Sequence, residues 1–289
     1  MIDSLVSVDW LADHLDDTDL VVLDCRIVMA GNRPVAGRDE YEAAHIPGAV
    51  FADLVNDLSD TSQPIGFAMP TPEAFAAAMG RLGVGDDHRV VLYDDRMEMP
   101  GMAFASVWAA RVWWMLRWVG CDDAALLDGG FGAWRDAGLP IAAGIELAEP
   151  AQLTPRVRPR LIADRNQVAA AIGDPEVSLV DVLPPGSYDG TAAMYGRPGH
   201  IPGAINLPVF DLYDARGCFL PDAEIADRHT AVEGRRTITY CGGGIAASAT
   251  AFALTRLGYE DVAVYTASLQ EWAADPANPL VTGSTPDGD

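Results

Sequence analysis

The chain has 289 residues, enough for about two domains of ordinary size, and its 49% hydrophobic and 21% charged residues are typical of a globular protein. The 42 acidic residues outnumber the 19 basic ones, and the net charge of −23 argues against nucleic acids and membranes as partners, because both attract clustered positive charge. Every basic residue is arginine, so chemistry that needs a lysine, such as a Schiff base or a P-loop, is excluded. The sequence shows no secretion signal, no membrane-spanning stretch and no CxxC pair, so a reducing cytoplasm is the expected location.

The first half of the chain alternates short apolar or β-branched runs with segments suited to helices. Residues 20–24 and 89–93 are expected to form buried parallel strands, and residues 124–130 close the pattern. The helix that follows residues 89–93 is expected to be capped by Asp94 and to end at Gly120, where a left-handed residue is favoured.

Residues 140–160 separate this half from the next one. They contain several prolines and no apolar periodicity, which predicts an extended linker on the surface. The expected domains are therefore residues 1–140 and 161–289, joined by a linker at residues 141–160, with the tail after Pro279 held loosely.

The second half repeats the pattern of the first. The pentapeptide His45-Ile46-Pro47-Gly48-Ala49 recurs as His200-Ile201-Pro202-Gly203-Ala204. Strands are expected at residues 178–181 and 237–240, followed by a helix that ends at Gly258. The expected fold class is α/β, with two domains that each contain a parallel sheet flanked by helices. Because His45 and His200 occur in both copies, a shared scaffold role is expected for them.

The two copies differ just after their second strand. The first copy has Asp94 there, whereas the second has Cys241 followed by three glycines and then a helix. The glycines allow backbone N–H groups to turn toward the sulfur as an anion-binding nest, and the helix presents its positive N-terminus. Cys241 is therefore expected to be a thiolate nucleophile at the carboxyl end of the sheet, where ligands bind in such folds.

These features resemble the tandem-domain rhodanese-like sulfurtransferases, which include thiosulfate and 3-mercaptopyruvate sulfurtransferases. The resemblance covers nearly the whole chain. It rests on the two HIPGA segments, on Tyr93-Asp94-Asp95, on Ala110-Arg111-Val112-Trp113-Trp114, on Leu127-Asp128-Gly129-Gly130, and on the Cys241 loop in the second copy alone.

The resemblance implies an inactive first domain and a second domain whose cysteine becomes a persulfide. In the implied ping-pong reaction, Cys241 takes a sulfur atom from a small donor and passes it to cyanide, a thiol or a protein acceptor. No metal and no cofactor are expected, since the sequence has no Cys/His cluster and no dinucleotide fingerprint. The loop that would hold the persulfide consists of Gly242, Gly243, Gly244, Ile245 and Ala246.

The same loop bears on the donor. Thiosulfate-using relatives commonly carry basic residues after the cysteine, whereas mercaptopyruvate-using relatives carry CG(S/T)G, so this chain slightly favours 3-mercaptopyruvate even though Gly243 lacks the hydroxyl. In mercaptopyruvate enzymes two arginines before the second GHIPG bind the carboxylate of the donor. Arg197 matches one of these positions, and Ser187 stands at the other. The resemblance also gives His45 a second candidate role, facing the loop of the second domain.

Two other functions fit parts of the pattern. A cysteine phosphatase has a similar strand, cysteine loop and helix, but it needs an arginine six residues after the cysteine, where this chain has Ala247. A persulfide carrier or sulfur-binding protein, with little turnover of small donors, would use the same Cys241 loop. Turnover with small donors separates this alternative from the sulfurtransferase.

Overall fold

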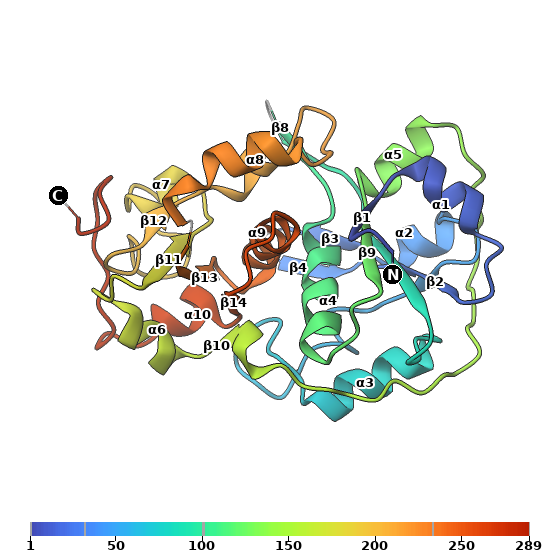
Figure 1. Ribbon diagram of the computed structural model, residues 1–289, viewed down its shortest axis with the longest axis horizontal. Coiled ribbons are helices and arrows are strands. Elements are labelled where there is room, and N and C mark those ends of the chain that lie inside the picture. The colour runs from blue at the N-terminus through green and yellow to red at the C-terminus, as the bar shows by residue number, and fades with distance from the viewer. Residues whose placement is uncertain (1, 32, 100–101, 233, 289) are drawn as a thin grey trace. The chain divides into compact units, whose positions relative to one another are not determined.

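The computed structural model describes residues 2–31, 33–99, 102–232 and 234–288 (Figure 1). The chain forms two compact units. The first consists of Met1–Ser62, Met69–Arg158 and Asp214–Phe219, and the second of Gln63–Ala68, Pro159–Tyr213 and Leu220–Asp289. Each half of the chain thus contributes one short segment to the other unit, which the sequence pattern does not predict.

The first unit is built on a five-stranded parallel sheet. Its strands, in spatial order, are β1 (Leu5–Val6), β9 (Ala124–Leu127), β6 (Arg89–Tyr93), β2 (Leu20–Asp24) and β5 (Val50–Phe51). The register places Asp24 beside Tyr93 at the carboxyl ends of β2 and β6. Apolar runs suit these strands because a parallel sheet is covered on both faces.

The second unit repeats this sheet with the same spatial order. Its strands are β10 (Ile162–Ala163), β14 (Val262–Tyr265), β13 (Arg236–Tyr240), β11 (Val177–Asp181) and β12 (Ile205–Asn206). Asp181 lies beside Tyr240, as Asp24 lies beside Tyr93. The predicted α/β fold class with two parallel sheets is confirmed.

Helices flank both sheets (Figure 1). In the first unit they are α1 (Val8–His14), α2 (Arg38–Ala43), α3 (Pro72–Arg81), α4 (Val107–Trp118) and α5 (Gly130–Asp136). In the second they are α6 (Arg165–Ala171), α7 (Pro185–Tyr188), α8 (Asp222–Arg228), α9 (Ile245–Arg256) and α10 (Ser268–Trp272), with 3-10 turns η1 (Pro159–Leu161), η2 (Val209–Leu212) and η3 (Thr230–Val232). The first unit also has two antiparallel hairpins, β3 (Ile27–Ala30) with β4 (Arg33–Ala36) and β7 (Met97–Met99) with β8 (Met102–Phe104). Gly120 and Gly258 come after α4 and α9 with φ +89° each, as predicted.

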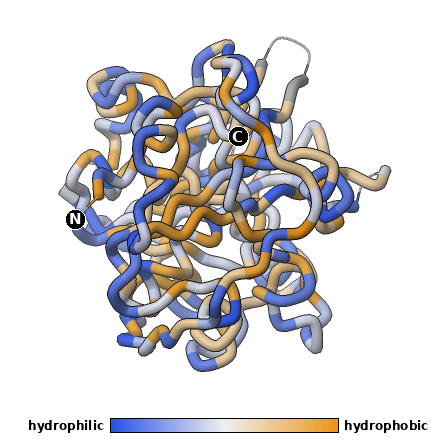
Figure 2. Tube along the Cα trace, turned by 90° about the vertical axis from the view of Figure 1, so that its right-hand side faces the viewer, coloured by the Kyte–Doolittle hydropathy of each residue, from blue (hydrophilic) through white to orange (hydrophobic). Residues whose placement is uncertain are grey.

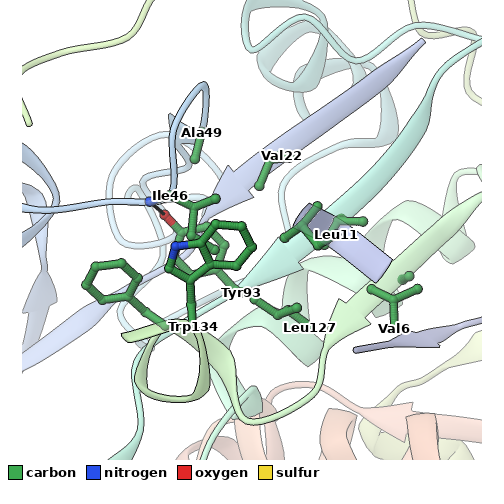
Figure 3. Packing of buried hydrophobic residues seen from close by; sticks show 11 residues of the cluster. Val6, Leu11, Val22, Ile46, Ala49, Tyr93, Leu127 and Trp134 are labelled. Atoms are coloured by element: carbon green, nitrogen blue, oxygen red, sulfur yellow. Dashed lines mark hydrogen bonds between the residues drawn. The ribbon is translucent and has the colours of Figure 1, made fainter. Parts of the chain in front are cut away.

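The core of the first unit gathers side chains from its strands, from α1 and α5, and from the first HIPGA segment (Figure 3). Trp134 is fully buried, and its indole N–H donates to the carbonyl of Pro140 at 2.7 Å. Each fully buried large side chain of this kind contributes about 1.5–3 kcal/mol. Apolar stretches alternate with hydrophilic ones along the chain (Figure 2), as expected for strands and helices joined by exposed turns. Among the described residues, no helix combines the length and hydropathy that a membrane span requires.

The first HIPGA segment is fixed by two tyrosines. His45 is fully buried, stacks on Tyr41 with 4.3 Å between ring centroids, and has Nδ1 2.8 Å from the Tyr41 carbonyl oxygen. The Tyr41 hydroxyl donates to the Ala49 carbonyl at 2.9 Å. The Ile46 N–H donates to the Tyr93 hydroxyl at 3.2 Å, the bond drawn in Figure 3.

The second HIPGA segment has the same contacts. His200 stacks on Tyr188 at 3.6 Å, with Nδ1 2.8 Å from the Tyr188 carbonyl oxygen. The Tyr188 hydroxyl donates to the Ala204 carbonyl at 2.7 Å, and the Ile201 N–H donates to the Tyr240 hydroxyl at 3.1 Å. These contacts of His45 and His200 support the scaffold role expected of both histidines.

The segment between the repeats is extended and bonded to the first unit. Its residue Ala142 pairs with His45, each N–H donating to the other's carbonyl at 2.9 Å. Further along, the Arg156 N–H donates to the Val119 carbonyl at 2.7 Å. The segment between the repeats is therefore also part of the hydrogen-bonded structure of the first unit.

The expectation of a loosely held tail after Pro279 is wrong. Val281 and His200 exchange two main-chain hydrogen bonds, at 2.9 and 3.0 Å, and the Gly203 N–H donates to the Pro286 carbonyl at 2.7 Å. The physical reason is that the main chain of His200 needs the partner that Ala142 supplies to His45.

Candidate active site

Cys241 comes directly after β13 and lies at the carboxyl end of the second sheet. It is only 3% exposed. Beside it in the sheet, Tyr240 pairs with Asp181, and burial raises the pKa of Asp181 to about 6. This is the edge of a parallel sheet at which ligands bind.

The sulfur of Cys241 is bound at the start of α9. The N–H of Gly244 donates to Sγ at 3.1 Å. Gly244 caps the helix with φ +80°, a conformation that glycine adopts without steric cost. Because the positive end of a helix dipole favours negative charge, this geometry favours a negative charge on the sulfur.

Residues around the start of α10 hold the Cys241 loop in place. The Cys241 N–H donates to the Ser268 Oγ at 3.1 Å, and the Ser268 hydroxyl donates to the Tyr265 carbonyl at 2.7 Å. The Leu269 N–H donates to the Cys241 carbonyl at 3.0 Å. Main-chain groups of Cys241 are therefore satisfied by neighbouring residues.

Two residues at this loop could not be predicted from the sequence, namely Tyr195 and Gln270. A Cβ atom on Gly242 would overlap the ring and hydroxyl of Tyr195, and one on Gly243 would lie 2.6 Å from Nε2 of Gln270. The signal that could have pointed to them is the glycine run itself, since side-chain space left empty beside a buried cysteine has to be filled from elsewhere in the fold.

The remaining predicted residues of the second unit lie on several elements. Ile245 and Ala246 form the first turn of α9, and Ser187 is buried in α7. Arg197 is half-buried. Its Nη1 donates to the carbonyls of Asp275 and Asn278, which come after α10. His45 belongs to the first unit, where its contacts support the scaffold role.

Asp94 occupies the corresponding position of the first unit and caps α4, as predicted. One carboxylate oxygen accepts the N–H of Ser106 at 2.5 Å, and the other accepts those of Trp108 at 2.7 Å and Ala109 at 3.1 Å. Burial raises the pKa of Asp94 to about 7. Where the second repeat presents a sulfur to the helix N-terminus, the first therefore presents a carboxyl group.

The other cysteines have less reactive surroundings. Burial raises the pKa of Cys25 well above its usual value, and it raises those of Cys121 and Cys218 to about 11. Thiols with such values are mostly protonated at neutral pH and are poor nucleophiles. Within the described ranges, no group of three or more His, Cys, Asp or Glu residues is placed to hold a metal ion.

The fold and the site define a tandem α/β protein in which one repeat has a cysteine sulfur at the N-terminus of a helix and the other has a carboxyl group at the corresponding helix. Residues 7–137 and 164–275 match the family described as Rhodanese-like domain. The chain is 35% identical over 291 residues to the probable 3-mercaptopyruvate sulfurtransferase of Pseudomonas aeruginosa. The aligned region covers 96% of this chain and 98% of that relative. The chain therefore belongs to the rhodanese-like sulfurtransferases, and it is an enzyme of the sulfurtransferase class.

Solved structures agree with this assignment. SseA from Escherichia coli, described as a 3-mercaptopyruvate sulfotransferase with the rhodanese fold, matches with a TM-score of 0.81 and 29% identity over 92% of this chain and 99% of that one. A structure of EanB with a cysteine persulfide and ergothioneine matches with a TM-score of 0.83 and 25% identity over 97% of this chain and 71% of that one.

Proposed function

We propose that the protein moves a sulfane sulfur from a small donor to cyanide or a thiol through a persulfide on Cys241. The observation that carries this proposal is the N–H of Gly244 at 3.1 Å from Sγ, at the positive end of α9. Such a donor favours whichever sulfur bears the negative charge as the reaction proceeds.

The two proposed steps balance without a further reagent. In the first, the Cys241 thiolate attacks the donor sulfur; a sulfur–sulfur bond forms, the bond between that sulfur and the rest of the donor breaks, and its electron pair leaves with the donor. In the second, the acceptor attacks the outer sulfur, the sulfur–sulfur bond breaks, and its electron pair returns to Cys241 as thiolate. The cysteine persulfide in the EanB structure supports chemistry of this kind in a protein of similar fold.

3-Mercaptopyruvate is the proposed donor ahead of thiosulfate. The loop from Gly242 to Ala246 has no positive side chain, and the protein carries a net charge of −23, so the thiosulfate dianion gains little from Coulombic attraction. With mercaptopyruvate, the electron pair of the broken carbon–sulfur bond passes into the enolate of pyruvate, which then takes up a proton. The name of the Pseudomonas aeruginosa relative points to the same donor.

Arg197 is the proposed ligand of the donor carboxylate. Its Nη1 is fixed by the carbonyls of Asp275 and Asn278, which restricts the orientation of the guanidinium group. Ser187, at the position of the second arginine of mercaptopyruvate enzymes, is proposed as an uncharged hydroxyl that takes the place of that arginine.

The test measures steady-state sulfur transfer to cyanide and to a thiol, with 3-mercaptopyruvate and thiosulfate compared as donors. The intact mass of the protein is recorded after treatment with each donor. We expect turnover and the gain of one sulfur atom in the wild type, and neither in Cys241→Ser, because a serine oxygen cannot form a persulfide. Cys218→Ser, which removes another thiol, serves as the control and should retain both. Turnover in Cys241→Ser would refute the proposal.

The persulfide carrier remains the alternative function, and the same experiment separates the two. A carrier would gain one sulfur atom on Cys241 but would show little turnover with small donors, and it would release the sulfur to a protein acceptor. Either function needs a thiol that stays reduced between cycles, so the proposed compartment is the reducing cytoplasm.

A further inference from the structure

Two side chains from distant parts of the chain occupy the space that the glycines after Cys241 leave free. The ring and hydroxyl of Tyr195 lie against Gly242, and the side-chain amide of Gln270 lies against Gly243. Both side chains are half-buried, and both belong to the second unit. They therefore line the Cys241 loop at the two positions next to the nucleophile.

The orientation of the Gln270 amide is set by its hydrogen bonds. The Gly66 N–H donates to Oε1 of Gln270 at 2.9 Å, so the oxygen is turned toward Gly66 and Nε2 toward Gly243. The main chain of the same residue is also fixed, because its N–H donates to the Gly242 carbonyl at 2.9 Å. An amide nitrogen offers two N–H donors, and here they are held beside the loop rather than free to rotate away.

The Tyr195 phenol is a donor of the same kind. Burial, followed by the charges of Cys241 and Asp181, raises the pKa of Tyr195 to about 12. The hydroxyl therefore keeps its proton at neutral pH. Together the two side chains give the loop uncharged hydrogen-bond donors and add no positive charge.

We infer that Gln270 and Tyr195 bind the oxygen atoms of the sulfur donor, and that the site thereby selects a small thiol compound with a carbonyl group next to a carboxylate. This inference rests on the proposed function and names the residues that would recognise its donor. Uncharged N–H and O–H groups are suited to a carbonyl oxygen, which becomes more negative as the carbon–sulfur bond breaks and the electron pair enters the enolate. The Gln270 amide would thus supply the donor group that the absent hydroxyl at Gly243 does not.

The inference also explains why positions 242 and 243 are glycine. A serine or threonine at position 243 would need the volume that Gln270 fills, so the loop hydroxyl and the Gln270 amide exclude one another. Gly66, from the Gln63–Ala68 segment, helps to keep Gln270 in that place by donating to its side-chain oxygen.

The test compares two sulfur donors in Gln270→Met and Tyr195→Phe, which conserve size but remove the N–H and O–H donors. 3-Mercaptopyruvate carries both kinds of oxygen, whereas inorganic polysulfide carries sulfur without any oxygen. We expect each variant to lose about 10- to 100-fold in kcat/KM for mercaptopyruvate, because the lost hydrogen bond strengthens as the carbon–sulfur bond breaks. The rate at which polysulfide loads Cys241, measured by intact mass, should fall at least fivefold less. Gln152→Met and Tyr259→Phe, outside the Cys241 loop, are matched controls.

Equal losses with both donors, or an unchanged kcat/KM for mercaptopyruvate in both variants, would overturn the inference while leaving the proposed function standing. A wild-type protein that gains no sulfur from either donor would instead refute the proposed function, and the inference with it. Thermal unfolding of each variant shows whether it is folded. Because Gln270 and Tyr195 lie on different segments, one folded variant is sufficient for the comparison of the two donors.

Discussion

Replacing Gly244 with alanine should reduce activity far more than stability. Gly244 has φ +80° at the start of α9, and its N–H donates to Sγ of Cys241 at 3.1 Å. The left-handed region costs an alanine about 1–2 kcal/mol. The loop should therefore relax, and the N–H should move away from the sulfur that it stabilises.

Gly258 provides a matched control at the other end of the same helix. Its φ is +89°, and apart from its own chain neighbours and the helix backbone no described residue has an atom within 4 Å of a Cβ placed on it. Gly258→Ala should therefore have a similar backbone cost of about 1–2 kcal/mol without disturbing Cys241. Both variants should lower the Tm by a few degrees, since about 1 kcal/mol corresponds to about 2–4 °C for a protein somewhat smaller than this one.

The assay is kcat/KM for sulfur transfer from 3-mercaptopyruvate to cyanide, together with thermal unfolding of each variant. A hydrogen bond to a charged group contributes about 1.5–3 kcal/mol, so Gly244→Ala should lose about 10- to 100-fold in kcat/KM. Gly258→Ala should stay close to the wild type. Equal losses of activity in the two variants would show that helix strain, and not the bond to sulfur, limits the reaction, and the reasoning would fail.

Three further results are expected. Burial raises the native pKa of Asp94 from 3.8 to about 7, so the folded state binds this proton more tightly than the unfolded state, and the unfolding free energy falls as pH rises from about 4 to 7. Asp94→Asn should flatten the pH dependence of the unfolding free energy over this range. An unchanged pH dependence in urea titrations would contradict this. Arg197→Ala should raise KM for mercaptopyruvate more than it lowers kcat. A fall in Tm with an unchanged KM would mean that Arg197 has only a structural role, through its hydrogen bonds to the carbonyls of Asp275 and Asn278. Deletion of residues 280–289 should lower the Tm by several degrees through loss of the bonds to His200 and Gly203, which differential scanning calorimetry would detect; an unchanged Tm would mean that these bonds add nothing.

The parts of the fold that could be predicted from the sequence are those encoded over a few neighbouring residues. One example is the strand that ends at Tyr240, which is followed directly by Cys241, its glycines and the helix that begins at Ile245. Because these parts are adjacent along the chain, their arrangement can be predicted from the order of the residues. The same holds for Asp94 and α4, where the carboxylate reaches the helix N-terminus twelve to fifteen residues later. Repetition of the pattern then indicated the second sheet from the first.

The contacts that could not be predicted join residues that are far apart in sequence. Gly66 and Gln270 are separated by 204 positions, and no spacing rule connects a backbone N–H with a distant amide. Tyr195 lies on an irregular loop before the second HIPGA segment, where no periodicity fixes the direction of its side chain. The bonds of the tail to His200 were hidden for a similar reason, because they depend on main-chain groups that every residue possesses.

Ala142 and Val281 also determine where each repeat can be cut without losing a partner of its HIPGA segment. A fragment of the first repeat that stopped at residue 140 would lose the partner of His45 and expose both of its main-chain groups, whereas a fragment running to Arg158 would keep the pairing. An inserted domain or an exchanged connection should accordingly be tolerated after Arg158 and disruptive between residues 141 and 158. In this protein the connection between the domains is therefore also the last structural segment of the domain that precedes it.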